Sequence, residues 1–177
     1  MKANEFYNSV KKFDVVFLEN GFKKIRRNQY IKPGFKLHVV LDRWGWEKKR
    51  GWGFFIRVTD NRYEGLYSSH DYAHGCLDIN AYSLIERQIL NREQLYDIYD
   101  HLESLESLKN DYWITFYDTE ELVKVLDLLL MPVLENIESW IKYQKKKPLI
   151  TNSLKNKAKR NELLDDLKQI FPDANIS

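Results

Sequence analysis

One ten-residue segment, residues 69–78 (SHDYAHGCLD), brings together side chains of the types that bind metals or act as nucleophiles. If this segment were helical, His70 and His74 would share one face four residues apart, as pairs of metal ligands do. However, Gly75 favours a turn, and the Glu that accompanies such a pair in zinc-dependent peptidases is missing. A polar loop is therefore the favoured interpretation, and no metal site is expected.

Cys76 is the only cysteine in the sequence, which excludes an internal disulfide and a cysteine-based zinc cage. His74 could activate its thiol as a base, with Asp71 or Asp78 orienting the imidazole. Residues two apart in a loop rarely point at each other, and no signature of a cysteine-dependent enzyme surrounds them. A buried structural thiol is the favoured interpretation. The glycines are scattered and form no phosphate-binding loop, so the sequence predicts no catalytic residues and no cofactor.

Residues 42–52 (DRWGWEKKRGW) mix cations with tryptophans. Trp44, Trp46 and Trp52 could stack on bases while the neighbouring Lys and Arg hold phosphates. They could equally form a protein-binding surface, because Trp and Arg are enriched at binding hot spots. A long hairpin whose tryptophans cover one end of the core is the third interpretation. Two acidic residues reduce the positive charge and no RNA-recognition or zinc-finger motif is present, so nucleic-acid binding is the less favoured function.

Four carboxylates recur every three residues along one slowly drifting helix face: Asp97, Asp100, Glu103 and Glu106. Such a row is usually a solvated face. The alternative is a docking surface for a basic protein, such as a nuclease whose cleft must be positive to hold phosphate. Nothing in the pattern indicates the burial that would shift a carboxyl pKa for acid–base catalysis. These four residues and the three tryptophans are the predicted partner-binding residues.

The net charge of +2 conceals three blocks of opposite sign. Residues 1–60 hold 14 Lys/Arg against 6 Asp/Glu, residues 61–140 hold 5 against 16, and residues 141–177 hold 9 against 4. Such blocks can attract one another within one fold, or they can steer a charged partner.

Hydrophobic periodicity predicts a helix over residues 4–19, ended by Asn20 and Gly21. Extended segments are expected over residues 22–31, 35–41 and 53–59, with a turn at Pro33-Gly34. Short links between them imply an antiparallel meander. Residues 61–80 are expected to form a loop or two short strands.

The second half should open with a helix over residues 91–108, begun by a capping box at Asn91 and Gln94. A short strand at 113–117 precedes a long helix that begins at Asp118 and is kinked or split at Pro132. The stripe of that helix expected to be buried comprises Leu122, Val125, Leu126, Leu129, Leu130, Val133, Leu134 and Ile137.

The predicted fold is therefore α+β, with one antiparallel sheet of about four to six strands and N-terminal and long C-terminal helices packed on it. Residues 1–144 are expected to form a single domain, and residues 145–177 a basic linker plus a short C-terminal helix. The N-terminus lacks the features of a signal peptide, and the most apolar segment, 126–134, is too short to span a membrane. A cytoplasmic protein without a membrane partner is expected, and the sequence carries no indication of oligomeric state.

Several of these features resemble a family of small bacterial proteins of unknown function. The resemblance rests on Gly21-Phe22-Lys23-Lys24 running to Tyr30, on a strand of the Phe54–Val58 kind, and on Tyr117-Asp118-Thr119-Glu120-Glu121-Leu122 opening a helix interrupted by Pro132. It covers most of residues 4–144 and implies an α+β fold with helices on one antiparallel sheet. It supplies no catalytic or binding residues. A looser resemblance, of size and style, is to the immunity proteins that neutralise bacterial toxins.

The sequence thus favours a non-enzymatic protein-binding module, in its most specific form an immunity-type inhibitor that binds a basic toxin. The alternative is a nucleic-acid-binding protein or enzyme that uses residues 42–52 and the basic C-terminal segment. A small-molecule pocket lined by Trp and Tyr stays open as a third interpretation.

Overall fold

The computed structural model describes residues 2–41, 52–61, 75–99 and 113–146. These residues form a six-stranded antiparallel sheet with helices on one of its faces, so the predicted α+β class is confirmed. The strands follow the order β1-β2-β3-β4-β5, and β6 also pairs with β4. Their bounds are β1 (Lys23–Arg26), β2 (Gln29–Lys32), β3 (Phe35–Leu41), β4 (Trp52–Asp60), β5 (Cys76–Ile79) and β6 (Ile114–Phe116).

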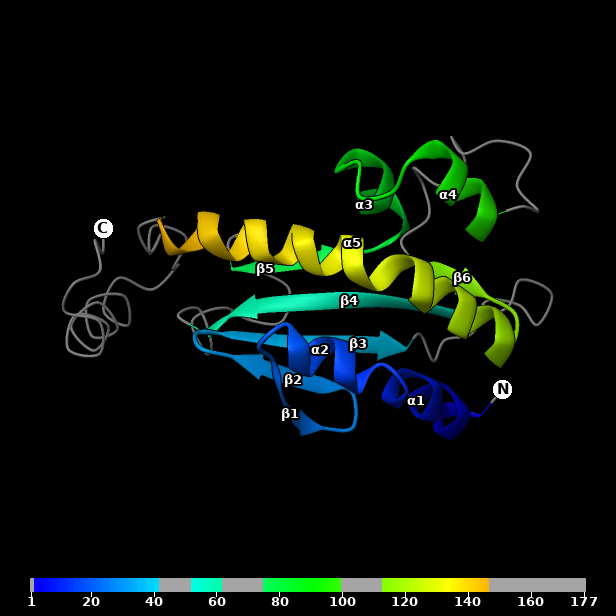
Figure 1. The fold of residues 1–177 in the computed structure, drawn as a ribbon, viewed down its shortest axis with the longest axis horizontal. Coiled ribbons are helices and arrows are strands. Elements are labelled where there is room, and N and C mark those ends of the chain that lie inside the picture. Colours follow the sequence, from blue (N-terminus) through cyan, green and yellow to red (C-terminus); the bar gives the residue numbers. More distant parts are fainter. Residues whose placement is uncertain (1, 42–51, 62–74, 100–112, 147–177) are drawn as a thin grey trace, which may run out of the picture.

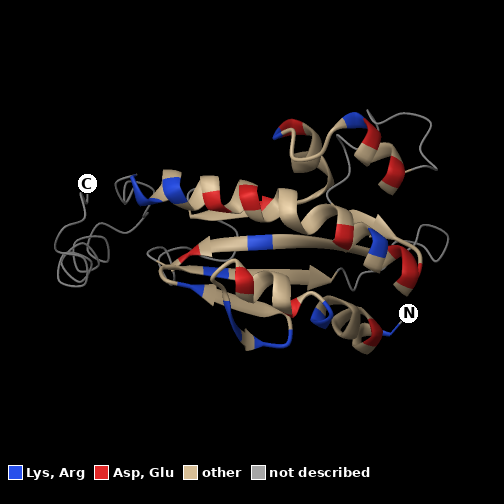
Figure 2. Ribbon diagram, in the orientation of Figure 1, with Lys and Arg blue, Asp and Glu red and all other residues tan. Residues whose placement is uncertain are grey.

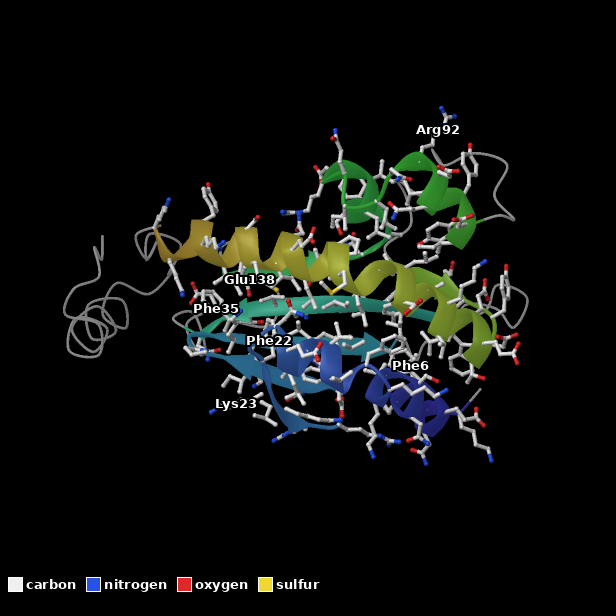
Figure 3. All side chains as sticks on the ribbon, in the orientation of Figure 1. Phe6, Phe22, Lys23, Phe35, Arg92 and Glu138 are labelled. Carbon is white, nitrogen blue, oxygen red and sulfur yellow. The ribbon has the colours of Figure 1, made fainter. Side chains whose placement is uncertain are left out.

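The helices are α1 (Ala3–Lys11), α2 (Asp14–Glu19), α3 (Ala81–Glu86), α4 (Arg92–Ile98) and α5 (Thr119–Lys145). Figure 1 shows α5 running along the sheet, and α2 contacts the edge strand β1. α1 packs against α5, and the rings of Phe6 (α1), Phe54 (β4) and Phe116 (β6) have centroids 5.9 to 6.1 Å apart. At the other end of α5, the Trp140 ring meets Phe35 of β3 edge-on at 5.9 Å (Figure 3).

The core lies between α5 and the sheet. Along β3 the side chains alternate between buried and half-buried, as the sequence predicts. All eight residues of the predicted α5 stripe are buried. The positive φ angles of Gly21 (81°) and Gly34 (84°) fit their predicted roles at a helix end and a turn.

Several predictions need correction. The helix expected over 4–19 is two helices, because Phe13 leaves helical geometry with ψ near 7°. The segment 22–31 is two strands, joined by a turn at Arg27-Asn28 without Gly or Pro, so the region expected to form three strands of the meander forms four. Of the two alternatives at Pro132, a kink or a split, the split is wrong, because α5 is continuous from Thr119 to Lys145.

The continuity of α5 has a physical reason. An internal proline costs about 3 kcal/mol in an exposed helix. Here Leu129, Leu130, Val133 and Leu134 on either side of it are all buried, each worth about 1.5–3 kcal/mol. Packing on the sheet therefore outweighs the lost hydrogen bond.

Two elements lie between β4 and α4, where sequence analysis expected a loop or two short strands over residues 61–80 and assigned no element to residues 81–90. β5 falls within residues 61–80, where short strands were one of the alternatives. α3 was not predicted, although Asn80 begins it with a capping box, its side chain accepting from Ser83 N at 2.8 Å. The helix expected over residues 91–108 ends earlier than predicted, because α4 ends at Ile98 and Tyr99 leaves helical geometry with φ −122° and ψ 47°. The short C-terminal helix expected within residues 145–177 lies outside the described residues.

Candidate functional site: an acidic surface on α4 and α5

Asp97 is the one member of the predicted carboxylate row that the structure describes. It is exposed on α4, opposite the buried Leu95 and Ile98 that hold this helix to the core. The capping box that opens α4 is present, with Asn91 Oδ1 accepting from Gln94 N at 2.9 Å. Asp100, Glu103 and Glu106 lie outside the described residues.

The end of α4 lies against the second turn of α5. Lys124 Nζ donates to the main-chain oxygen of Asp97 at 3.4 Å. One turn earlier on α5, Glu121 accepts from the main-chain N–H of Tyr117. These contacts join Tyr117, α4 and the start of α5 into one surface.

The start of α5 adds further negative charge to this surface. Asp118 Oδ1 accepts from the main-chain N–H groups of Glu120 and Glu121, each at 2.9 Å, so it caps the helix. Carboxylates here are stabilised by the positive end of the helix dipole. Asp127 is exposed two turns further along.

We define the acidic surface as Glu93, Asp97, Asp118, Glu120, Glu121 and Asp127. Figure 2 shows acidic positions on α4 and on the first half of α5. The described cations on the same stretches are Arg92 and Lys124. Within the part of the chain that the structure describes, none of the six carboxylates forms an ion pair. Together these six carboxylates give this part of the molecule a negative field.

Trp52 does not stand in a loop. It is the first residue of β4, lies opposite Phe116 in the register with β6, and is half-buried against the hydrophobic core. Its position fits the interpretation in which a tryptophan covers one end of the core. Trp44 and Trp46 lie outside the described residues.

The second face of the sheet, opposite the helices, holds Cys76 and Asp78, two of the groups that sequence analysis considered for catalysis. Arg57 of β4 and Asp78 of β5 are register partners and form a bidentate ion pair, with both N–O distances at 2.7 Å. Cys76 Sγ lies 3.5 Å from the same carboxylate. Burial, and then Asp78, raises the pKa of the half-buried Cys76 thiol to about 12. Since the thiolate is the nucleophile, this thiol is unsuited to catalysis at neutral pH.

His38 joins this cluster, and sequence analysis did not single it out. It lies directly opposite Arg57 across β3 and β4. Burial, followed by the positive charges of Arg57 and Lys36, lowers the pKa of His38. The signal that could have identified the cluster is strand alternation, which places His38, Arg57 and Asp78 at positions facing away from the core.

The other two histidine candidates, His70 and His74, and Asp71 lie outside the described residues. Among the residues that the structure does describe, no three His, Cys, Asp or Glu side chains are grouped to hold a metal ion. No helix in these described ranges has both the length and the apolar character needed to cross a membrane.

Comparison with known proteins adds no further assignment. No family model matches the chain, and neither the curated proteins nor the solved structures include a significant match to it. The fold thus defines the protein as α+β, and the resemblance to a bacterial family of unknown function stays a prediction.

Proposed function

We propose that this chain is a non-enzymatic protein-binding module that docks a basic partner protein on the acidic surface. The observation that carries the proposal is the group of six carboxylates on α4 and at the start and first half of α5, five of them exposed and Glu121 half-buried, none of which is in an ion pair among the described residues. Such a field attracts a basic protein, accelerates association and disfavours acidic competitors.

Two aromatic side chains supply the anchors that a charged surface alone lacks. Tyr96 on α4 is 37% exposed and Tyr117 before α5 is 46% exposed. Tyr96 directly precedes Asp97, and Tyr117 directly precedes Asp118. Tyrosines among charged residues are typical of the residues that dominate binding energy at protein interfaces.

The specific form of the proposal is an immunity-type inhibitor of a bacterial toxin. A nuclease or similar toxin needs a positive cleft to hold phosphate, and an acidic surface of this kind is complementary to such a cleft. The half-buried, protonated thiol of Cys76 supports a role without catalysis.

The test is capture of a protein partner from cells that contain this protein, followed by affinity measurement with the purified partner. The variant Asp97→Lys/Glu120→Lys reverses two charges of the acidic surface. The control Glu19→Lys/Glu86→Lys makes the same change in net charge at exposed positions on α2 and α3. We expect a basic partner whose affinity falls at least about tenfold in the first variant, chiefly through slower association, and is unchanged in the control.

Equal binding by both variants, or a partner that is not basic, would overturn the proposal. The inhibitor form has its own readout. If the partner is an enzyme, its activity should disappear at one equivalent of this protein. A partner that stays fully active in the complex would rule out inhibition.

A further inference from the structure

A second charged surface, of opposite sign, lies where α1 meets the β1–β2 turn. Arg27 in this turn is exposed, yet its guanidinium is fixed against α1. Nη1 donates to Asn4 Oδ1 at 2.9 Å, and Nη2 donates to Asn4 O at 3.2 Å and to Asn8 Oδ1 at 3.4 Å. Its Cζ atom lies 4.8 Å from the centre of the Tyr7 ring. All of these partners are neutral, so Arg27 is oriented without losing its charge.

The neighbouring cations on α1 extend this charge. Asn4, Asn8 and Lys11 are spaced so that they share one side of the helix. Arg27 contacts Asn4 and Asn8. Lys11 therefore lies on the side of α1 that faces Arg27, about one turn beyond Asn8. Lys12 follows at the end of α1, and both lysines are exposed.

The edge strand β1 adds two more exposed cations. Lys23 pairs with Ile31 and Arg26 with Gln29, and the register shifts between Lys24 and Arg26. In a regular strand, residues three apart would face opposite sides. The bulge instead turns Arg26 to the second face, the side on which Lys23 lies. Figure 3 shows Lys23 at the outer edge of the ribbon.

We define the basic surface as Lys11, Lys12, Lys23, Arg26 and Arg27, on both sides of the β1 edge (Figure 2). None of the five forms an ion pair within the described part of the chain. The nearby carboxylates have other partners. Asp14 holds Lys24 at 2.6 Å and Tyr30 at 2.8 Å, and Glu5 accepts the main-chain N–H of Lys2 at 2.6 Å.

We propose that the basic surface binds the phosphate backbone of a nucleic acid, without reading its bases. Because three residue steps of β1 lie opposite only two of β2 at the bulge, Lys23 and Arg26 are about 7 Å apart along the strand, which allows them to contact neighbouring phosphates of one chain. The Asn4 and Asn8 amides supply uncharged donors, which are common in phosphate contacts. A bulged edge is a poor template for a further strand, which disfavours an acidic peptide added to the sheet. This proposal uses none of the residues of the acidic surface and stands independently of it.

The test is fluorescence anisotropy of the full chain with a labelled oligonucleotide, single-stranded and duplex, across a range of salt concentrations. Binding should weaken linearly in log–log form as salt rises, as counterion release requires. Lys23→Glu/Arg26→Glu should lower the affinity at least about tenfold and reduce the salt slope by about one per lost phosphate contact. Arg27→Gln should lower the slope by about one.

The matched control is Lys142→Glu/Lys145→Glu, which makes the same change in net charge at exposed positions in the last turns of α5. It should keep the affinity within about twofold of the original, since these cations lie outside the basic surface. Circular dichroism and thermal melting verify that each variant is folded. Absence of binding at low salt, an equal loss in the control, or equally effective competition by polyglutamate would overturn the proposal.

Discussion

The side-chain amide of Asn28 lies between two acceptors, with Nδ2 at 2.8 Å from His38 Nε2 and 2.8 Å from Val39 O. The carbonyl of Val39 can only accept, so the amide group must point its hydrogens toward both. Nε2 of His38 therefore accepts, and the proton of the neutral ring is on Nδ1. Protonation of His38 would place a hydrogen on Nε2, where the Asn28 amide already donates one, so the contact with Asn28 favours the neutral ring. This agrees with the pKa of His38, which burial and then the positive charges of Arg57 and Lys36 lower.

This arrangement predicts a stability that depends on mildly acidic pH. The pKa of His38 is lower in the folded state than its ordinary value of 6.5, so the unfolded chain binds the proton more tightly. Stability is then complete above about pH 6.5 and decreases as the pH falls below this value toward the folded-state pKa. Urea unfolding between about pH 8 and pH 5 should show the decrease, and His38→Gln should make it smaller.

The other three histidines are present in both proteins, so the difference between the two pH profiles isolates His38. Identical profiles for the original chain and His38→Gln would contradict this account of the Asn28 contact.

A second prediction concerns Asp14, which ties α2 to the sheet. Its carboxylate accepts from the buried Tyr30 hydroxyl at 2.8 Å and holds Lys24 at 2.6 Å, while the Tyr30 ring stacks on Phe17 at 4.2 Å. Burial and the adjacent carboxylate raise the pKa of Tyr30, so its hydroxyl stays a donor. Asp14→Ala should cost about 1–3 kcal/mol, because it leaves a buried hydroxyl without its acceptor.

Tyr30→Phe removes the hydroxyl itself, so no buried donor is left without an acceptor. It should therefore lower the free energy of unfolding by less than Asp14→Ala does, about 0.5–1.5 kcal/mol. Glu19→Ala, on the exposed side of the same helix, is the control and should change the free energy of unfolding by less than about 0.5 kcal/mol. Chemical denaturation of the three variants measures the order. If Tyr30→Phe lowered the free energy of unfolding more than Asp14→Ala does, the unsatisfied Tyr30 hydroxyl would not be the reason why Asp14 stabilises the protein.

Much of the fold could be predicted because its signals are local. Alternation along β3, the capping box at Asn91 and the buried stripe of α5 each depend on residues within a few positions of one another. The turn at Arg27-Asn28 could not, because no Gly or Pro marks it. It is stabilised from a distance, by Asn28 bonding to Val39 of β3. The break at Phe13 was likewise missed, and Phe17 in the second of the two helices stacks on Tyr30 of β2, a contact between separate elements.

In the two charged surfaces, too, local features could be predicted from the sequence, whereas contacts between distant elements could not. Helical spacing alone predicted that Asp97 would be exposed, and it is. Its proximity to the start of α5 depends on Lys124, 27 residues further along the chain. The basic surface depends on the contact of Arg27 with Asn4, 23 residues earlier, and on a bulge in β1. Sequence periodicity does not contain such contacts, because they are fixed by how separate elements pack.

The last prediction compares two glycines whose replacement should be costly for different reasons. At Gly53 of β4, a Cβ atom would lie 2.7 Å from Cβ of Trp113. Trp113 is itself held by the ring of Phe55, at 5.1 Å between centroids, so it has little freedom to retreat. Gly53→Ala should therefore destabilise the protein by about 1–3 kcal/mol through steric overlap.

Gly34, in contrast, has nothing within 4 Å of the added atom, but its φ of 84° is unfavourable for other residues. Gly34→Ala should cost about 1 kcal/mol, and Gly34→Asn less, because Asn tolerates this conformation. At Gly53 the order reverses, since the larger Asn increases the overlap. Urea unfolding of the four variants (Ala and Asn at Gly34 and at Gly53) tests whether Asn costs less than Ala at Gly34 and more than Ala at Gly53. Asn less harmful than Ala at both positions would mean that backbone conformation, and not the contact with Trp113, requires glycine in β4.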